Sequence, residues 1–424
     1  MMGKTYQITE YGSFVRDKEV QGCILLPQGT FDALENFVLT NRSRETDALE
    51  LLGLSARNGI GKIITAKNYV GVISMNDGTT IEILPKIFSS DAENAGKTKK
   101  LLVEMLKTLR NSPFKSLQTT HVNIEKMNIF EVFIRMFIDE VFFIVKRGLK
   151  CNYETIQTNA SVFKGKLKFS EQIRYNYAHK ERNYVEYDEF NSNRIENKLL
   201  KSTLLYLCRH SVSSKNKNDI KTLLSYFIGV EESVDYAGDF AKIVSERNTK
   251  DYETALLWSN VFLRGKSFAS FSGSEVAFAL LFPMELLFES YIATQMNRLL
   301  KGTNCILSAQ DRKYHLFDEP RKRFLMKPDI VIRDKVSKQI FIMDTKWKIL
   351  SDAKANYGIS QADMYQMYVY QKKYDSENVT LIYPMTDKVE NKSIIYQSVD
   401  GVIVRICFVD LYHLKESLEM VLER

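Results

Sequence analysis

The segment 327–348, KPDIVIRDKVSKQIFIMDTKWK, constrains the fold more than any other part of the chain. It contains two short apolar runs, Ile330–Ile332 and Ile340–Met343, joined by a polar stretch. Such runs predict two β-strands in a hairpin. Asp329 stands at the mouth of the first strand and Asp344 ends the second, so the hairpin is expected to bring these two acidic residues side by side.

Lys346 follows Asp344 by two positions. Side chains two apart on a strand point to the same face, so both are predicted to face one pocket while the Thr345 side chain points away. Asp329 and Asp344 are candidate ligands for Mg²⁺ or Mn²⁺, with the Thr345 backbone carbonyl as a further oxygen ligand. A divalent cation beside an ammonium suits phosphodiester hydrolysis, so these residues predict a metal-dependent enzyme of that class.

An isolated PD…DxK string has another interpretation, in which the aspartates cap turns and the lysine faces solvent. The two apolar strands around it favour the site. Glu289, in LLFESYIA, is a candidate third carboxylate and metal ligand, or else an exposed helix residue. Gln366 and Tyr370 are four apart on a helix expected from about residue 360 to 374, so they share a face and are further candidate catalytic residues.

The formal net charge of +7 permits nucleic-acid binding without requiring it. Lys348 could touch a phosphate if the strand continues past Lys346. Trp347 is expected to pack under the sheet, and the alternative is stacking on a base. A basic cluster just before the hairpin is a candidate DNA contact, or else a solvated loop; it comprises Arg321, Lys322 and Arg323.

Periodicity along the chain predicts a multidomain α+β protein. Residues 1–95 are expected to form a β-rich module, because strands at Asn68–Ser74 and Thr80–Leu84 flank an Asp-Gly turn. Residues 96–265 are expected to be mainly helical, interrupted by a hairpin at Ala160–Phe169. Residues 266–424 are expected to form an α/β domain with a mixed sheet.

Several classes of protein are disfavoured. The five cysteines are far apart and form no CxxC pair, which argues against a zinc ribbon, an iron–sulfur cluster or a disulfide framework. The start lacks the apolar core of a signal peptide, and the apolar run Val132–Val145 is too short to cross a bilayer. We therefore expect a cytoplasmic protein without membrane contact.

Several segments resemble one known family. PMELLFESYIA, KPDIVI, IFIMDTKWK and DMYQMYVY resemble the nuclease domain of the McrC family, part of the PD-(D/E)xK superfamily, and the Gln–Tyr pair resembles its RecB-like branch. NYVGVIS with TIEILPKIF resembles the McrC amino-terminal module, and RNYVEYDEFNSNRIENKLLK its middle region. The resemblance lies in patches from about residue 68 to 371.

The resemblance implies a Mg²⁺-dependent endonuclease subunit of an antiviral restriction system. It also implies double-stranded DNA as substrate and a McrB-like AAA+ GTPase hexamer as partner, docked on residues 1 to about 260. This chain is not expected to be the GTPase, because ARNGIGKI lacks the first glycine of a phosphate-binding loop and has Ile63 in place of Ser or Thr. Two alternatives remain: a non-cleaving adaptor that activates an AAA+ ring, and a stand-alone RecB-like DNA nuclease.

Overall fold

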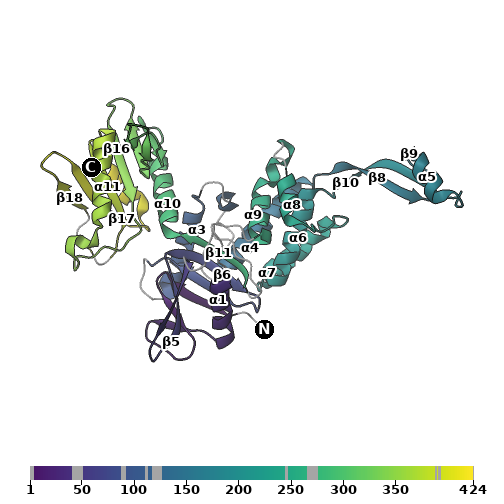
Figure 1. Ribbon diagram of the computed structural model, residues 1–424, viewed down its shortest axis with the longest axis horizontal. Coiled ribbons are helices and arrows are strands. Elements are labelled where there is room, and N and C mark those ends of the chain that lie inside the picture. Colours follow the sequence, from purple (N-terminus) through teal and green to yellow (C-terminus); the bar gives the residue numbers. More distant parts are fainter. Residues whose placement is uncertain are drawn as a thin grey trace. The chain divides into compact units, whose positions relative to one another are not determined.

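The computed structural model describes residues 4–40, 51–86, 92–109, 113–116, 127–243, 247–264, 276–386, 389 and 393–423 (Figure 1). The chain divides into two compact units. The larger unit takes in Lys4–Met75, Thr79–Ile129 and Gly273–Arg424, and the smaller unit takes in Asn76–Gly78 and Phe130–Ser272. The predicted combination of several α and β parts with mixed sheets is confirmed.

The amino-terminal part of the larger unit contains two four-stranded sheets. One has the order β3-β2-β5-β4, formed by Cys23–Leu25, Ser13–Val15, Gly61–Ala66 and Leu52–Arg57. The other has the order β1-β7-β6-β11, formed by Thr5–Thr9, Thr80–Leu84, Tyr69–Met75 and Val276–Pro283. The accompanying helices are α1 (Gln28–Thr40), α3 (Ala92–Leu106) and the short 3₁₀ turn η1 (Pro113–Ser116). The predicted β6–β7 hairpin is confirmed, and Gly78 supplies the positive φ (+85°) of its turn.

Strand β11 pairs with β6, although the two are far apart in the sequence. The pairing depends on Gly71, whose φ is +142° and whose missing Cβ would lie 2.0 Å from the carbonyl oxygen of Leu280. Any other residue would therefore push the strands apart. From β11 the chain passes into α10 (Met284–Leu299), and the Met284 amide donates to the Asn68 carbonyl at 3.1 Å.

The carboxyl-terminal part of the larger unit is built on a six-stranded mixed sheet. Its order is β12-β15-β16-β17-β19-β18, formed by Cys305–Ala309, Ile330–Asp334, Ile340–Thr345, Asn378–Pro384, Ile403–Val409 and Ser393–Gln397. The central strands β16, β17 and β19 are parallel and the outer ones antiparallel, so the predicted mixed sheet is confirmed. A separate hairpin consists of β13 (His315–Phe317) and β14 (Arg323–Leu325), and the remaining helices are α11 (Gln361–Tyr374), α12 (Leu414–Leu422) and the 3₁₀ turn η5 (Ala355–Gly358).

Helix α11 packs on β16, β17 and β19. Its buried Met367 and Tyr370 join a core with Ile342 of β16 and Leu381 of β17. Each fully buried Ile or Leu side chain contributes roughly 1.5–3 kcal/mol. This packing fixes α11 over the carboxyl end of β16, where Asp344 lies.

The smaller unit has a helical part and a projecting arm (Figure 1). Its helices are α4 (Ile129–Arg147), α6 (Ile195–His210), α7 (Ser214–Leu224), α8 (Tyr236–Lys242) and α9 (Glu253–Arg264), with 3₁₀ turns η3 (Ser225–Phe227) and η4 (Arg247–Tyr252). Trp258 of α9 is fully buried between Phe133 and Phe262, with ring centroids 5.8 and 5.3 Å away. Aromatic packing of this kind contributes beyond simple area burial.

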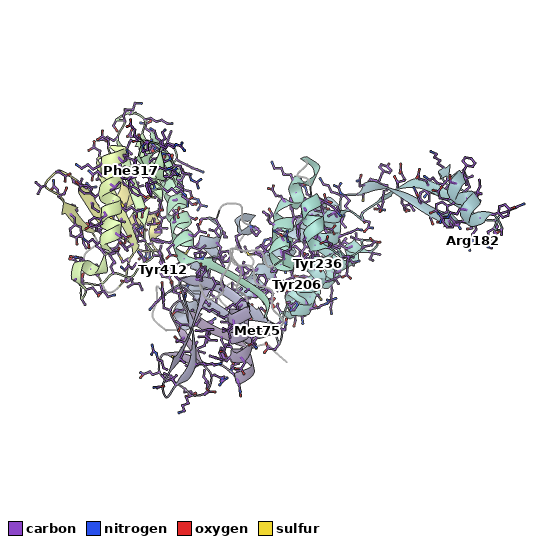
Figure 2. All side chains as sticks on the ribbon, viewed as in Figure 1. Met75, Arg182, Tyr206, Tyr236, Phe317 and Tyr412 are labelled. Carbon is purple, nitrogen blue, oxygen red and sulfur yellow. The ribbon has the colours of Figure 1, made fainter. Side chains whose placement is uncertain are left out.

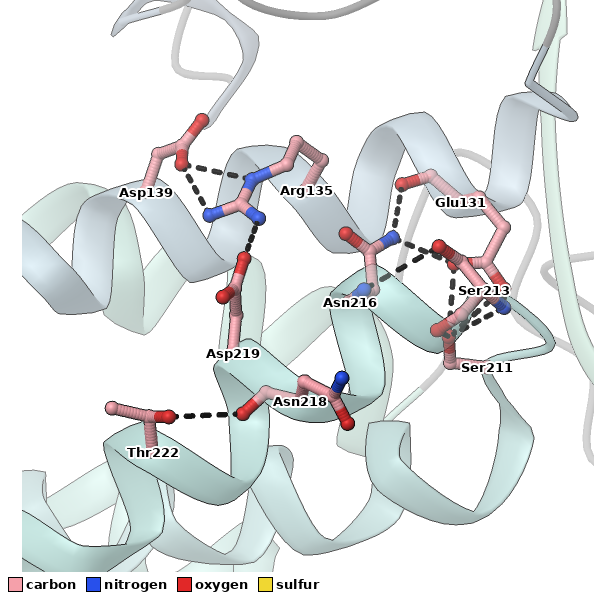
Figure 3. A network of polar contacts seen from close by, with 9 residues as sticks. All are labelled: Glu131, Arg135, Asp139, Ser211, Ser213, Asn216, Asn218, Asp219 and Thr222. Carbon is pink, nitrogen blue, oxygen red and sulfur yellow. Dashed lines mark hydrogen bonds and ion pairs between the residues drawn. The ribbon is translucent and has the colours of Figure 1, made fainter.

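A buried carboxylate joins α4 to α7 (Figure 3). Glu131 is only 3% exposed and accepts hydrogen bonds from the Ser211 hydroxyl at 2.9 Å and the Asn216 side-chain amide at 2.7 Å. Its other oxygen accepts from the backbone amides of Val212 and Ser213 at 2.5 and 3.2 Å, just before α7 begins. A negative charge at a helix amino terminus is favourable, so this contact is structural.

The arm is a three-stranded antiparallel sheet, β8-β10-β9, with a helix at its end. It is formed by Asn152–Ala160, Asn183–Asn191, Lys166–Leu167 and α5 (Phe169–Asn176), and Arg182 lies at its far tip (Figure 2). The predicted hairpin at Ala160–Phe169 is wrong, because β8 pairs with β10 along its whole length. Apart from the buried Val185, the residues of these strands are exposed or half-buried, so their sequence lacks the alternation that marks a half-buried strand.

Two expected absences can be compared with the structure. All five cysteines are free thiols in the structure. Within the described ranges, no helix is both long enough and apolar enough to pass through a bilayer. The apolar run around Val132–Val145 forms part of α4, in which Phe133 and Phe137 are fully buried.

Candidate active site

The candidate site lies where β15 and β16 meet the helix α11. Ile330 of β15 pairs with Met343 of β16. This register puts Asp329, one residue before Ile330, beside Asp344, one residue after Met343. The Asp329 backbone amide donates a hydrogen bond to the Asp344 carboxylate. The structure therefore brings the two predicted carboxylates together.

The Lys346 side chain lies on the same side as that of Asp344 and pairs with it. Its Nζ lies 2.6 Å from Asp344 Oδ2, and the side chains are 26% and 2% exposed, respectively. The ammonium thus points to carboxylates and not into the apolar core. Because Asp344 is almost completely withdrawn from water, this ion pair is poorly screened.

Two residues of helix α11, Gln366 and Asp363, contact the Lys346 amine. Gln366 Oε1 accepts a hydrogen bond from Lys346 Nζ at 3.3 Å, and Gln366 Nε2 donates to the Tyr370 hydroxyl at 2.8 Å. Asp363, one turn earlier, places Oδ1 3.6 Å from Lys346 Nζ. The predicted Gln–Tyr pair therefore forms a short relay that fixes the position of the lysine amine.

Burial and neighbouring charges shift the pKa values of Asp329, Asp344 and Lys346. Burial, reinforced by the charges of Asp344 and Glu289, raises the pKa of Asp329 to about 7. Burial also raises the pKa of Asp344, against the opposing effect of Lys346. Burial alone would lower the pKa of Lys346, but Asp344 and the neighbouring aspartates outweigh it and raise that pKa. Lys346 is consequently a cation at neutral pH, and the acidic pair has an excess of negative charge.

Two expectations about side-chain direction need correction. The Thr345 side chain does not point away: its backbone amide and its hydroxyl both donate to Asp329 Oδ2, each at 2.7 Å. The short hydroxyl reaches the neighbouring strand end because Asp329 turns toward it. Lys348 does not continue the strand of Lys346, since β16 ends at Thr345 and the Lys348 amide bonds back to the Lys346 carbonyl at 3.0 Å in a tight turn.

The oxygen atoms at the site are the kind of ligand that a hard divalent cation such as Mg²⁺ prefers. Asp329 and Asp344 offer carboxylate oxygens, and the charge that raises the pKa of Asp329 is the kind that a bound cation neutralises. Glu289 on α10 lies close enough to affect Asp329. Across the described ranges, no three His, Cys, Asp or Glu side chains are grouped closely enough to form a complete metal site. Asp329 Oδ2 instead accepts from Thr345, and Asp344 Oδ2 forms an ion pair with Lys346.

The basic candidates are all exposed on the surface. The three residues of the basic cluster are all exposed, and they occupy the turn and first position of the β13–β14 hairpin; they are Arg321, Lys322 and Arg323. Lys348 is exposed, and its Nζ donates to the Gly358 carbonyl at 2.6 Å. These positions are accessible to a large ligand.

Sequence reasoning missed two contributors to the site. Asp363 was identifiable in principle, since it precedes Gln366 by three positions and shares its helix face. Glu10 was not identifiable, because it is remote in sequence: its carboxylate accepts the indole N–H of Trp347 at 2.7 Å. Trp347 also packs against Phe288 of α10, with ring centroids 5.3 Å apart.

The chain is similar to one known protein family and to solved structures. The family model described as "McrBC 5-methylcytosine restriction system component" matches residues 64–384, which is more than half of the chain. No curated protein matches the sequence significantly.

Two solved structures share the fold. A chain in a half-complex of Thermococcus gammatolerans McrB AAA+ hexamers with bound McrC is 18% identical, with a TM-score of 0.69 and coverage of 99% of this chain and 100% of that chain. A chain in the cryo-EM structure of the Thermococcus gammatolerans McrBC complex is 19% identical, with a TM-score of 0.50 and coverage of 70% of this chain and 88% of that chain. At these identities the likeness shows the fold.

Proposed function

Because this chain belongs to the McrBC 5-methylcytosine restriction family, we propose that it is the subunit that cuts DNA in such a system, through a metal-dependent PD-(D/E)xK site. The observation that carries the proposal is the close grouping of Asp329, Asp344 and Lys346. Structural ion pairs rarely leave two buried carboxylates sharing a single nearby cation, whereas active sites often do.

Each residue has a separate task in this proposal. Asp329, Asp344 and the Thr345 carbonyl would hold Mg²⁺ or Mn²⁺, with Glu289 as a further carboxylate; the cation would neutralise charge on the phosphate and help to ionise water. The Lys346 ammonium, kept protonated by its neighbours, stabilises negative charge on the substrate oxygens.

The DNA duplex would be held by cations outside the pocket. The exposed basic cluster on the β13–β14 hairpin precedes Asp329 by only a few residues in the chain. Phosphates bound by the cluster would therefore be close in sequence to the site. Lys348, exposed beside the pocket, would contact a phosphate nearer to the cut. Contacts of this type position the duplex without reading its sequence.

We further propose that the chain works with a McrB-like AAA+ GTPase hexamer, since McrC is bound to McrB AAA+ hexamers in the related Thermococcus gammatolerans half-complex. The arm supports a protein partner, because it exposes large apolar side chains that a monomer has no reason to keep in water. The most exposed include Val162 (72%), Phe169 (73%), Ile173 (68%) and Tyr177 (85%).

The test is cleavage of double-stranded DNA by the chain with its GTPase partner, with and without Mg²⁺. Asp344→Asn and Lys346→Ala should each reduce the cleavage rate by about 100-fold or more, while stimulation of GTP hydrolysis is unchanged. Asp375→Asn, at an exposed position in the same domain, is the matched control and should cut normally. Cleavage that persists in both site variants would refute the proposed site, and stimulation without any cleavage in the unmodified chain would favour the adaptor.

A further inference from the structure

A pocket in the larger unit is lined partly by residues that directly follow Lys346 of the candidate active site in the chain. Its volume is about 210 Å³, and its lining includes Glu10, Tyr11, Lys86, Trp347 and Lys348. Ligand pockets for drug-sized molecules begin at roughly 300 Å³. This pocket is therefore suited to a single ring system.

Glu10 gives the pocket an unused hydrogen-bond acceptor. The residue is 0% exposed, and its Oε1 accepts from the Lys86 backbone amide at 2.9 Å and from Trp347 Nε1 at 2.7 Å. Its Oε2 is buried and has no hydrogen-bond partner among the residues that the structure describes. Leaving such an oxygen unsatisfied is costly, so a buried acceptor in a pocket wall calls for an explanation. A ligand that donates an N–H would satisfy it.

The remaining walls are aromatic and cationic. Trp347 is held in place by Glu10 on one side and by Phe288 on the other. Tyr11 is 53% exposed, and Lys86 Nζ lies 5.6 Å from the centroid of its ring. Aromatic surfaces beside lysine side chains are the usual elements of single-stranded nucleic-acid sites, where rings stack on bases and cations meet phosphates.

Position in the chain connects the pocket to the cut. Trp347 and Lys348 directly follow Lys346, so a strand whose phosphate reaches Lys346 has its next nucleotide near the pocket. We propose that this pocket binds one nucleobase of the DNA strand next to the scissile phosphate, with an exocyclic amino group donating to Glu10 and a phosphate against Lys86 or Lys348. The inference deepens the proposed nuclease function and rests on it.

Trp347 provides a direct readout. The chain has only two tryptophans, and the other, Trp258, is fully buried in the smaller unit. In EDTA, single-stranded oligo-dA and oligo-dC should quench the emission of the full chain in a saturable manner, and oligo-dT, which lacks the amino group, should quench it less. Trp347→Phe should abolish the quenching, whereas Trp258→Phe should retain it.

The Glu10→Gln variant distinguishes a role of Glu10 in binding the base from a role in holding Trp347 in place. Its carbonyl can still accept from Trp347 and Lys86, but an amide N–H₂ replaces the free acceptor, so the preference for amino-bearing bases should disappear while Trp347 emission without DNA is unchanged. Tyr11→Ala should weaken oligo-dA binding by roughly 5- to 100-fold, the usual range for one stacked base.

The proposal is overturned if oligonucleotides bind, as judged by anisotropy of a labelled probe, without changing Trp347 emission, or if Glu10→Gln keeps the original base preference. Neither measurement requires cleavage or a metal. If the proposed nuclease function is wrong, the chain should not cut DNA but oligonucleotides should still quench Trp347 emission. If only the base pocket is wrong, quenching should be absent while the chain still cuts DNA.

Discussion

Replacing Asp329 with asparagine should stabilise the metal-free protein while it abolishes cleavage. The structure explains both effects. Asp329 Oδ2 accepts two hydrogen bonds from Thr345, and an asparagine carbonyl can accept both. The second oxygen becomes an amide N–H₂ beside the Asp344 carboxylate, so a repulsive contact becomes an attractive one. Asparagine is, however, a neutral and much weaker ligand for Mg²⁺.

The magnitude follows from the raised pKa. Asp329 has a pKa of about 7 in the folded chain against an ordinary 3.8, and one pKa unit corresponds to about 1.4 kcal/mol. Between these two values the folded state holds more protons than the unfolded state, so stability falls as pH rises. The full penalty at pH 8 is about 4 kcal/mol, of which roughly half accrues between pH 5.5 and 8. We expect the asparagine variant to recover at least about 2 kcal/mol at pH 8.

The assay is urea unfolding in EDTA at pH 5.5 and 8, followed by Trp347 emission in a Trp258→Phe background so that the larger unit alone is reported. Asp375→Asn serves as the neutral control. Mg²⁺ at 100 times its dissociation constant should add about 2.7 kcal/mol to the unmodified chain and little to the Asp329→Asn variant. If the variant is no more stable than the parent at pH 8, or if its advantage is larger at pH 5.5, the electrostatic account of the site is wrong.

Three other outcomes follow from the same contacts. Gln366→Leu removes the acceptor that orients Lys346, so the single-turnover cleavage rate should fall about 10-fold with DNA affinity unchanged; Tyr370→Phe, which spares the direct contact, should fall less. Glu131→Ala strips the α7 amino terminus of its buried acceptor and should lower the unfolding free energy of the smaller unit by roughly 3 kcal/mol in thermal or urea denaturation, whereas the exposed Glu189→Ala should not. Alanine at all three positions of the basic cluster should weaken DNA binding and reduce the slope of log affinity against log salt by up to about 3, and an unchanged slope would exclude phosphate contact; the positions are Arg321, Lys322 and Arg323.

The part of the site that lies on consecutive strands could be predicted from the sequence. Asp329, Asp344 and Lys346 are related by a hairpin and a two-residue spacing, and both are local geometric rules. The Gln366–Tyr370 pair was likewise a matter of helical periodicity, and α11 begins within one residue of its expected start. The direction of the Thr345 side chain was predicted wrongly because its hydroxyl donates to Asp329 at the end of the neighbouring strand, and strand alternation does not determine such a cross-strand contact.

The arm could not be predicted for a different reason. Its strands carry exposed aromatic residues such as Tyr153 (69%) and Phe190 (61%), and Val185 is their only fully buried residue. Sequence periodicity reports which side of a strand is buried, and a ribbon exposed on both sides has no such signal. The same residues that hide the arm from sequence analysis make it the strongest candidate for a protein-binding surface in the smaller unit.

The contact between Glu10 and Trp347 shows most clearly what sequence patterns cannot predict, because the two residues are 337 positions apart in the chain. Nothing local marks Glu10 as buried; a glutamate after a short strand is ordinarily solvent-exposed. Strand β11 pairs with β6 of an amino-terminal sheet, and Gly71 permits this pairing. Because α10 follows β11 directly, the pairing ties the amino-terminal sheets to the part of the chain that contains Trp347. Disturbing that pairing, for example by Gly71→Ala, should therefore weaken the hold of Glu10 on Trp347 and lower cleavage without altering any residue of the acidic pocket. A Gly71→Ala chain that folds, shows altered Trp347 emission and still cuts at the parental rate would show that the contact between Glu10 and Trp347 is dispensable for the site, and unaltered emission would refute the role given to the β11–β6 pairing.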